Sequence, residues 1–320
     1  MSDNPFDPNY VAPEPKAPEA DKPRAVITTP GMYPDVTCAQ YFSEPCPEAA
    51  LNHSTIKLLY PEGAAPEKAA YHHPAIGLPP EERKATIAQY RGKLVHRLAL
   101  DKGEDYEISP FDDYRSKEAR DWKAKVERNG KMPVKKSQFD EASKMADIAR
   151  AAIRETTQGF EYLTEVVIAW TEEVEVDGKT VTIWCRAMID VWCPALNLAL
   201  DVKTAADALD DAVLRQFSNG YATQDVWYLR GLGKVFGNHG LNRFGFLFVE
   251  SDPPHLSRTV TSTESFRFGV KGYIETAMEI FARCMSRNEW PGYEPFYAYP
   301  PDWMLRRWDA AEQMRILNGK

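Results

Sequence analysis

Three consecutive strand patterns constrain the fold of this chain more than any other feature of its sequence. Each is rich in β-branched and aromatic or other apolar residues: EYLTEVVIAW (161–170), TVTIWCRAMIDVW (180–192) and LNLALDVK (196–203). Asp177 and Gly178 lie between the first two, and Asp-Gly in that position predicts a β-hairpin. The third segment follows a turn at Pro194. The sequence therefore predicts three consecutive antiparallel strands.

Helical patterns surround these strands. Six helices are predicted, over residues 52–60, 76–100, 116–130, 137–155, 210–232 and 265–287. Asn52 or Ser54 can cap the first of them, and Gly130 is a suitable residue just beyond the end of the third. A fourth strand, RFGFLFVES (243–251), follows the fifth helix. The order of helix, three antiparallel strands, helix and strand predicts an α/β fold with a mixed central sheet flanked by helices.

Composition sets the class of protein and its division into parts. The chain has 320 residues and is 43% hydrophobic and 27% charged, which is ordinary for a globular protein. Residues 1–30 are rich in proline and acidic residues and predict a disordered tail, which leaves residues 31–320 as a single domain. No segment has the pattern of a membrane span or a signal peptide, so we expect a cytoplasmic protein. The five cysteines contain no CxxC, which argues against a disulfide framework and a structural zinc site.

An acid and a base stand at the end of the third predicted strand. Asp201 and Lys203 are two residues apart, so their side chains lie on one face of the strand about 6.6–7 Å apart. Asp190 ends the preceding strand, and hairpin pairing can bring it close to Asp201. Two carboxylates so close repel each other, and a divalent cation removes that repulsion. Oxygen ligands without a thiolate select a hard ion, Mg²⁺ or Mn²⁺.

Four further residues can complete this site. Glu165 on the first strand can reach it from a neighbouring position, and His96, on an apolar helix face, can supply a nitrogen ligand. Gln224 and Tyr228 are four residues apart on the predicted helix 210–232, so they share one face. Each alone has an ordinary structural explanation, as a core histidine, a cross-strand partner, a solvated amide or a half-buried aromatic. The ordered combination is more specific than any single member.

A basic segment is present although the net charge of the chain is −8. Residues 113–136 contain nine Lys or Arg against four Asp or Glu. Such a helix can contact the phosphates of a nucleic acid, with Arg115, Lys117 and Arg120 as the candidates, although it can equally be a solvated face.

These motifs resemble the PD-(D/E)XK nucleases, and among them the RecE (exonuclease VIII) group of phage recombination exonucleases. The similarity covers about residues 31–308. Its motifs are GKLVHRLAL with His96, TEVVIAW with Glu165, WCRAMID with Asp190, ALDVKTAAD with Asp201 and Lys203, and QDVWY with Gln224 and Tyr228. RSKEARDW and NEWPGY are similar as well. The resemblance implies the αβββαβ nuclease core with helical N-terminal additions.

The resemblance also implies an activity and a set of roles. The activity is Mg²⁺-dependent digestion of linear double-stranded DNA from the 5′ end, with Mn²⁺ able to substitute, and the resulting 3′ strands would serve a single-strand annealing protein. The metal ligands implied are His96, Asp190, Asp201 and the Val202 carbonyl, with Glu165 holding a second metal or its waters. Lys203 would orient or deprotonate the attacking water, and Gln224 and Tyr228 would help hold the DNA end. A homo-oligomeric ring in a bacterial host cell, encoded by a phage or prophage, is the expected setting.

The sequence departs from the family pattern at two positions and leaves other functions open. Ile189 stands where the family motif has proline, and Met188 stands where a basic residue is common, although Arg186 is nearby. An endonuclease of the same superfamily and a catalytically inactive DNA-binding recombination scaffold are the alternatives. An NTPase is disfavoured because GLGKVFG lacks the spacing of a phosphate-binding loop and the hydroxyl residue after Lys234.

Overall fold

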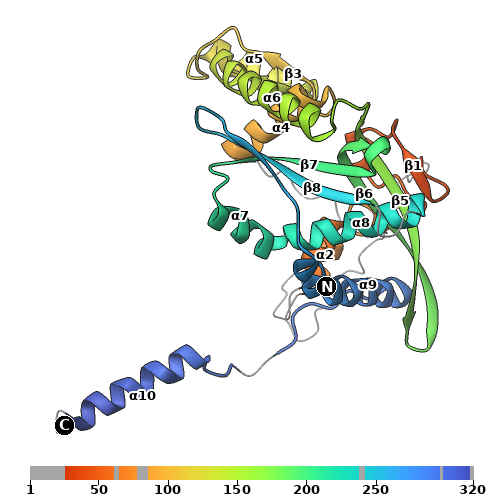
Figure 1. The fold of residues 1–320 in the computed structure, drawn as a ribbon, viewed down its shortest axis with the longest axis vertical. Helices are drawn as coiled ribbons and strands as arrows, with labels where there is room; N and C mark the ends of the chain where they lie inside the picture. The colour runs from red at the N-terminus through yellow and green to blue at the C-terminus, as the bar shows by residue number, and fades with distance from the viewer. Residues whose placement is uncertain (1–25, 61–64, 78–85, 238–241, 296–297, 318–320) are drawn as a thin grey trace, which may run out of the picture.

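A computed structural model describes residues 26–60, 65–77, 86–237, 242–295 and 298–317 (Figure 1). Residues 1–25 of the predicted disordered tail lie outside the described residues. Ile27, within the range predicted as tail, is fully buried, and its N–H donates to the Pro45 carbonyl at 2.9 Å. The folded part therefore includes at least this residue, while a single domain over residues 31–320 stays a prediction.

A mixed sheet forms the centre of the fold. Its strands are β1 (Gly31–Tyr33), β2 (Ala50–Leu51), β5 (Leu163–Val176), β6 (Lys179–Cys193), β7 (Leu198–Ala205), β8 (Arg243–Glu250) and β9 (Ser257–Val260). The order is β1-β5-β6-β7-β8-β9, and β2 pairs with β6 off this path. β5, β6 and β7 are antiparallel neighbours, whereas β8 runs parallel to β7. β3 (Tyr106–Ile108) and β4 (Met132–Val134) form a separate parallel pair.

The β5–β6 hairpin forms where the sequence predicts it. Asp177 and Gly178 adopt φ values of 52° and 73°, the left-handed backbone of a two-residue hairpin turn. Because glycine adopts this backbone at no steric cost and aspartate tolerates it, the local sequence is sufficient to place this turn.

Helices cover both faces of the sheet (Figure 1). Their bounds are α1 (Cys38–Phe42), α2 (His53–Leu59), α3 (Pro66–His72), α4 (Ile87–Leu100), α5 (Lys117–Arg128), α6 (Lys136–Thr156), α7 (Asp210–Gln216), α8 (Ala222–Phe236), α9 (Glu264–Arg287) and α10 (Asp302–Leu317). One hydrophobic core joins α4 and α6 to the sheet, and another joins α2, α8 and α9 to its opposite face. The predicted α/β class with a mixed central sheet flanked by helices is confirmed.

The helix predicted over residues 210–232 is interrupted, and this part of the prediction is wrong. A π-helical segment, Phe217–Tyr221, separates α7 from α8, and Gly220 within it has φ 122°, outside the helical region. The chain changes direction there. Helix α8 then packs closely on β5, because a Cβ atom at Gly231 would lie 2.6 Å from the Trp170 ring. This close approach sets the distance between α8 and the sheet.

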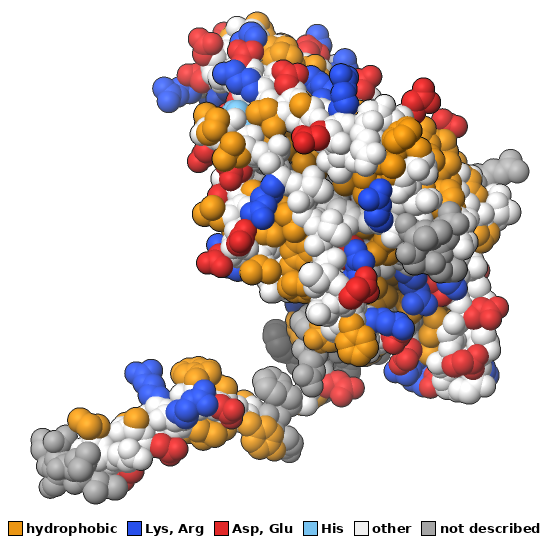
Figure 2. Space-filling model, in the orientation of Figure 1, with side chains coloured by type: hydrophobic (Ala, Val, Ile, Leu, Met, Phe, Trp, Pro, Cys, Tyr) orange, Lys and Arg blue, Asp and Glu red, His pale blue; other side chains and the backbone are white. Residues whose placement is uncertain are grey.

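The C-terminal helix α10 stands apart from the rest of the structure (Figures 1 and 2). Its exposed apolar side chains include Trp303, Leu305, Trp308 and Met314. None of the described helices is long and apolar enough to cross a membrane. All five cysteines are free thiols.

Candidate active site

The three predicted carboxylates lie at one level on three neighbouring strands. Glu165 on β5 stands opposite Asp190 on β6, between the ladder pairs Thr164↔Val191 and Val166↔Ile189. Val191 of β6 pairs with Leu200 of β7, so Asp190 and Asp201 are opposite each other one residue further along these strands. Glu165 has φ 45°, so the ladder is interrupted at this level and the backbone is strained there. Strain of this kind is typical of functional sites rather than of ordinary strands.

Asp190 is the most perturbed carboxylate of the group. It is buried, and its Oδ2 accepts a hydrogen bond from the Val202 N–H at 2.7 Å. Burial and then the negative charge of Asp201 raise the pKa of Asp190 to about 6, against the opposing effects of His96 and Lys203. The predicted meeting of the two aspartates is therefore present, and it has the electrostatic consequence expected for two like charges.

Asp201 and Lys203 project from the same face of β7, as predicted. The Lys203 Nζ lies 2.5 Å from Asp201 Oδ2, and Gln224 Nε2 donates to Asp201 Oδ1 at 2.6 Å. Burial by itself would lower the pKa of Lys203, but the nearby carboxylates Asp201 and Asp190 outweigh it and raise that pKa above its ordinary range. The side chain is therefore an ammonium group in this arrangement.

His96 reaches the site from α4. Its Nε2 lies 2.6 Å from the Val202 carbonyl oxygen and 3.7 Å from Asp190 Oδ2. The helix can approach β7 because residue 92 is glycine: a Cβ atom there would lie 3.2 Å from Thr204 Oγ1. Thr86 caps the start of α4 in a capping box with Gln89, which fixes where the helix begins.

Glu165 lies on the outer side of Asp190. Burial raises its pKa, and the charges of His96 and Lys102 act in the opposite direction. Lys102, just beyond α4, donates to the carbonyl of Thr164 at 2.9 Å and so ties the start of β5 to the end of this helix. A carboxylate with a raised pKa is well suited to hold a cation or a proton.

Gln224 and Tyr228 both lie on α8, but they differ in what they contact. Gln224 is buried against Asp201, so its side chain is not the solvent-exposed amide that was the alternative interpretation. Tyr228 is buried in the core beside Phe244, with ring centroids 5.2 Å apart. Burial, and then the nearby charge of Asp201, raises the pKa of its phenol well above the ordinary value.

Sequence reasoning missed Tyr221, the residue that ends the π-helical segment. The Lys203 Nζ lies over its ring, 5.3 Å from the centroid, and the ring stacks on Phe246. The glycine within 217–221 was the available signal, because glycine inside a helical pattern marks a break. His53 braces the same break, with its Nε2 3.0 Å from the Gly220 carbonyl oxygen.

The donor groups fit a hard divalent cation. His96 Nε2 lies close to the Val202 carbonyl and to Asp190, and Asp201 Oδ2 has an ion pair but no hydrogen bond among the described residues. No three His, Cys, Asp or Glu side chains in the described ranges are already arranged as a metal site. This is consistent with the Asp201 oxygens being engaged by Lys203 and Gln224. The donors are nitrogen and oxygen only, without a thiolate, which fits a divalent cation.

The three predicted phosphate-contacting residues are exposed, whereas Arg186, the arginine close to the Met188 position of the family motif, is buried. Lys117 and Arg120 are exposed in the first turn of α5, and Arg115 is exposed just before it, with its guanidinium 3.7 Å from Asp113. Arg186, in contrast, is fully buried, forms an ion pair with Glu44 at 3.1 Å and donates to the Tyr41 carbonyl. It anchors the N-terminal segment to the sheet and is not available to DNA.

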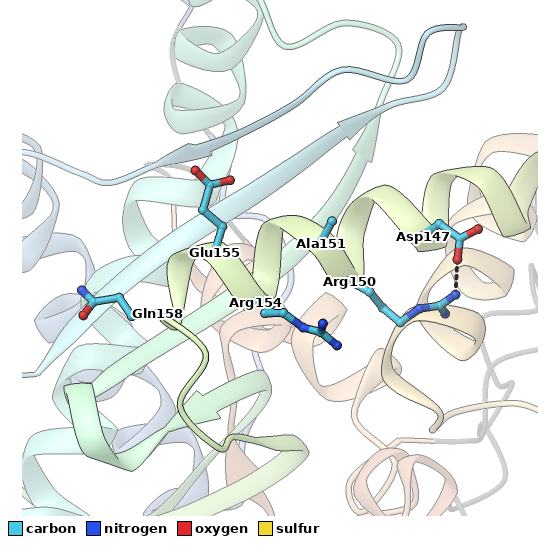
Figure 3. Close-up of a pocket in the computed structure, with 6 residues that line it drawn as sticks. All are labelled: Asp147, Arg150, Ala151, Arg154, Glu155 and Gln158. Carbon is cyan, nitrogen blue, oxygen red and sulfur yellow. Dashed lines mark hydrogen bonds and ion pairs between the residues drawn. The ribbon is translucent and has the colours of Figure 1, made fainter.

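A surface groove lies elsewhere on the molecule. It runs along α6, has a volume of about 580 Å³ and is lined by Asp147, Arg150, Ala151, Arg154, Glu155 and Gln158 (Figure 3). Its charges are mixed, and Arg150 forms an ion pair with Asp147. None of the carboxylates of β5, β6 and β7 lines it, so this groove is separate from the candidate site.

Comparison with known families identifies the fold. Residues 79–295 match the family described as a PDDEXK-like domain of unknown function (DUF3799). The chain belongs to this family. The match includes His96, all three carboxylates and Lys203, and it agrees with the sheet that carries them. The predicted PD-(D/E)XK core is therefore confirmed, and family and fold together support a nuclease.

Solved structures give a consistent but distant picture, and no curated protein matches the chain. A "putative exonuclease" from Eubacterium rectale is 13% identical, with a TM-score of 0.50 over 80% of this chain and 92% of that one. A phage-related exonuclease from Haemophilus somnus 129PT is 14% identical, with a TM-score of 0.28 over 61% of this chain and 95% of that one. The first similarity supports the fold, and the second is too distant to support a conclusion.

Proposed function

We propose that this PDDEXK-family chain is a metal-dependent exonuclease that digests linear double-stranded DNA from its 5′ ends and leaves 3′ single strands. The observation that supports the proposal best is the alignment of Glu165, Asp190 and Asp201 at one level of the sheet, with Lys203 and His96 beside them. Phosphodiester hydrolysis is among the slowest uncatalysed reactions, and this set of groups has the charges that it needs.

The residues have distinct proposed roles. His96, Asp190, Asp201 and the Val202 carbonyl would hold Mg²⁺, which Mn²⁺ could replace, and Glu165 would hold a second ion or its waters. A bound ion of this kind lowers the pKa of a coordinated water and neutralises charge on the scissile phosphate.

The remaining groups would orient the attacking water, the Asp201 carboxylate and the DNA end. Lys203 is paired with Asp201 and protonated, so we propose that it orients the water and stabilises negative charge on the phosphate. Gln224 would hold Asp201 in its orientation, and Tyr228 would support the wall against which the DNA end is placed.

An end-labelled digestion tests both the reaction and its direction. Linear duplex DNA labelled on one strand at its 5′ or its 3′ end is incubated with the protein, with Mg²⁺ or with a chelator. We expect Mg²⁺-dependent release of the 5′ label first, and loss of activity in Asp201→Asn and Lys203→Ala. Lys271→Ala, on the exposed surface of α9, is the matched control. An undiminished rate in Lys203→Ala would refute the assignment, and earlier release of the 3′ label would reverse the direction.

The same assay separates the two alternatives. An endonuclease would cut covalently closed circular DNA, which an exonuclease leaves intact. A catalytically inactive recombination scaffold would bind DNA and release no label under any condition. The alignment of the carboxylates with a lysine favours a catalytic protein over the scaffold.

The wider setting is also a proposal. A 3′ single strand is the substrate that a single-strand annealing protein requires, so such a protein is the proposed partner, in the cytoplasm of a bacterial host. A homo-oligomeric ring would keep the enzyme on its DNA. The exposed apolar side chains of α10, among them Trp303 and Trp308, support association between copies, since large exposed apolar surfaces mark interaction sites. Light scattering of the purified protein would measure the oligomeric state.

A further inference from the structure

A cationic and aromatic cluster lies between α5 and the start of α6, and we define it by four residues: Tyr114, Trp122, Lys123 and Lys135. The ammonium groups of both lysines lie 5.3 Å from the centroid of the Tyr114 ring. Trp122 stacks on the same tyrosine, with centroids 6.4 Å apart and an interplanar angle of 12°. One lysine comes from α5 and the other from the residue before α6, so only the folded chain brings them together.

The cluster holds two cations in place without neutralising them fully. An aromatic ring attracts a cation through its quadrupole but carries no net charge. Lys123 also lies 3.6 Å from Glu127, whereas Lys135 has no ion pair among the described residues. The Tyr114 hydroxyl donates to the Pro133 carbonyl at 3.3 Å, which fixes the ring against β4. Two lysines restricted in this way lose less conformational entropy when they bind an anion than two free ones would.

Helix α4 links the cluster to the candidate active site. Tyr90 on α4 donates to the same Pro133 carbonyl, at 2.6 Å. His96 follows six residues later, about 9 Å along the helix axis at 1.5 Å per residue. Gly92, between them, lies against Thr204, the residue after Lys203. The first half of α4 therefore contacts both β7, at Thr204, and the Pro133 carbonyl to which Tyr114 of the cluster also donates.

We propose that the cluster binds backbone phosphates of the DNA outside the site of cleavage. The inference rests on the proposed function, since it takes DNA as the substrate. It differs from the prediction for Arg115, Lys117 and Arg120 because it assigns the contact to lysines that an aromatic ring positions.

Binding measured as a function of salt tests the inference without relying on cleavage. A short fluorescent blunt duplex is titrated with the full chain in chelator, and anisotropy gives Kd over a series of KCl concentrations. Lys123→Gln with Lys135→Gln keeps the apolar stems but removes both charges. We expect Kd to rise about tenfold, and the slope of log K against log salt to become less steep by about 2, roughly one for each phosphate contact. The double variant Lys179→Gln with Lys271→Gln removes the same charge from distant exposed positions, and it should bind like the original chain.

The tyrosine supplies the second arm of the test. Tyr114→Leu removes the ring that positions the lysines but leaves their charges, and we expect weaker binding. Tyr114→Phe keeps the ring and should recover most of the affinity that Tyr114→Leu loses. Circular dichroism checks that each variant is folded.

The outcomes are separable. Equal Kd values and salt slopes in the lysine variant and in its control would overturn the inference while leaving the proposed nuclease activity in place. A lower affinity with an unchanged salt slope would also overturn it, since no phosphate contact would have been lost. If the original chain does not bind the duplex but digests it with Mg²⁺, this inference is wrong and the proposed function stands; if it neither binds nor digests the duplex, both are wrong.

Discussion

Asp190→Asn should make the ion-free protein more stable at neutral pH. The folded protein raises the pKa of Asp190 from 3.8 to about 6, first through burial and then through the charge of Asp201. A difference of about 2 pKa units corresponds to about 3 kcal/mol of stability that the ionised carboxylate costs above pH 6. Asparagine removes the charge and keeps an oxygen that can accept the Val202 N–H, so most of this cost should disappear.

The pH dependence fixes the sign of this effect. Between pH 3.8 and 6 the folded state binds more protons at Asp190 than the unfolded state does, so its contribution to stability decreases as pH rises through this window. We therefore expect the stabilisation by Asp190→Asn to be close to zero near pH 4 and to reach its maximum, up to about 3 kcal/mol, above pH 6.

Urea unfolding in chelator, followed by circular dichroism at a series of pH values, measures this difference. Asp112→Asn, an exposed change of the same type, is the control and should have little effect. Adding Mg²⁺ should stabilise the original protein more than the Asp190→Asn variant, since a ligand stabilises only the state that binds it. A variant less stable than the original protein at pH 7 in chelator would refute the electrostatic reasoning.

Four further substitutions test three separate parts of the structure. Gln224→Ala removes the hydrogen bond that orients the Asp201 carboxylate, so digestion should require about 10–100-fold more Mg²⁺. A titration of digestion rate against Mg²⁺ concentration measures this, and an unchanged requirement would contradict the role. Arg186→Leu leaves Glu44 charged and buried, and should reduce the free energy of unfolding by about 3–5 kcal/mol in urea; a loss below about 1 kcal/mol would be inconsistent with a buried ion pair. Gly220→Ala should reduce stability by about 1 kcal/mol or more, because φ is 122° and the added Cβ would lie 3.1 Å from a lysine side chain. Gly269→Ala, in open space on helix α9, should instead stabilise by about 0.5–1 kcal/mol, and the same sign for both glycines would refute the backbone argument.

The elements with strong local signals were predictable from the sequence. Asp177-Gly178 placed the hairpin because its backbone conformation is a property of those two residues. Asn52 caps α2 as one of the two predicted candidates, since its side chain accepts from the Thr55 N–H. The helix predicted over 265–287 is α9, Glu264–Arg287, which an apolar stripe is sufficient to define.

Weak or conflicting local signals account for the errors. Gly220 lies inside a helical pattern, and periodicity alone does not show that the chain turns there. Strands of two to four residues, such as β2 and β9, have too few positions for an alternating pattern and depend on their partners for stability.

For the candidate site, the sequence determined the chemistry and the tertiary structure determined the distances. The residue types and the two-residue spacing of Asp201 and Lys203 follow from the chain itself, because a strand places alternate side chains on one face. The alignment of Glu165 with Asp190 and the arrival of His96 beside the Val202 carbonyl depend on strand register and on how closely α4 packs. Register and helix packing are set by contacts between segments far apart in the chain, and no local pattern encodes them.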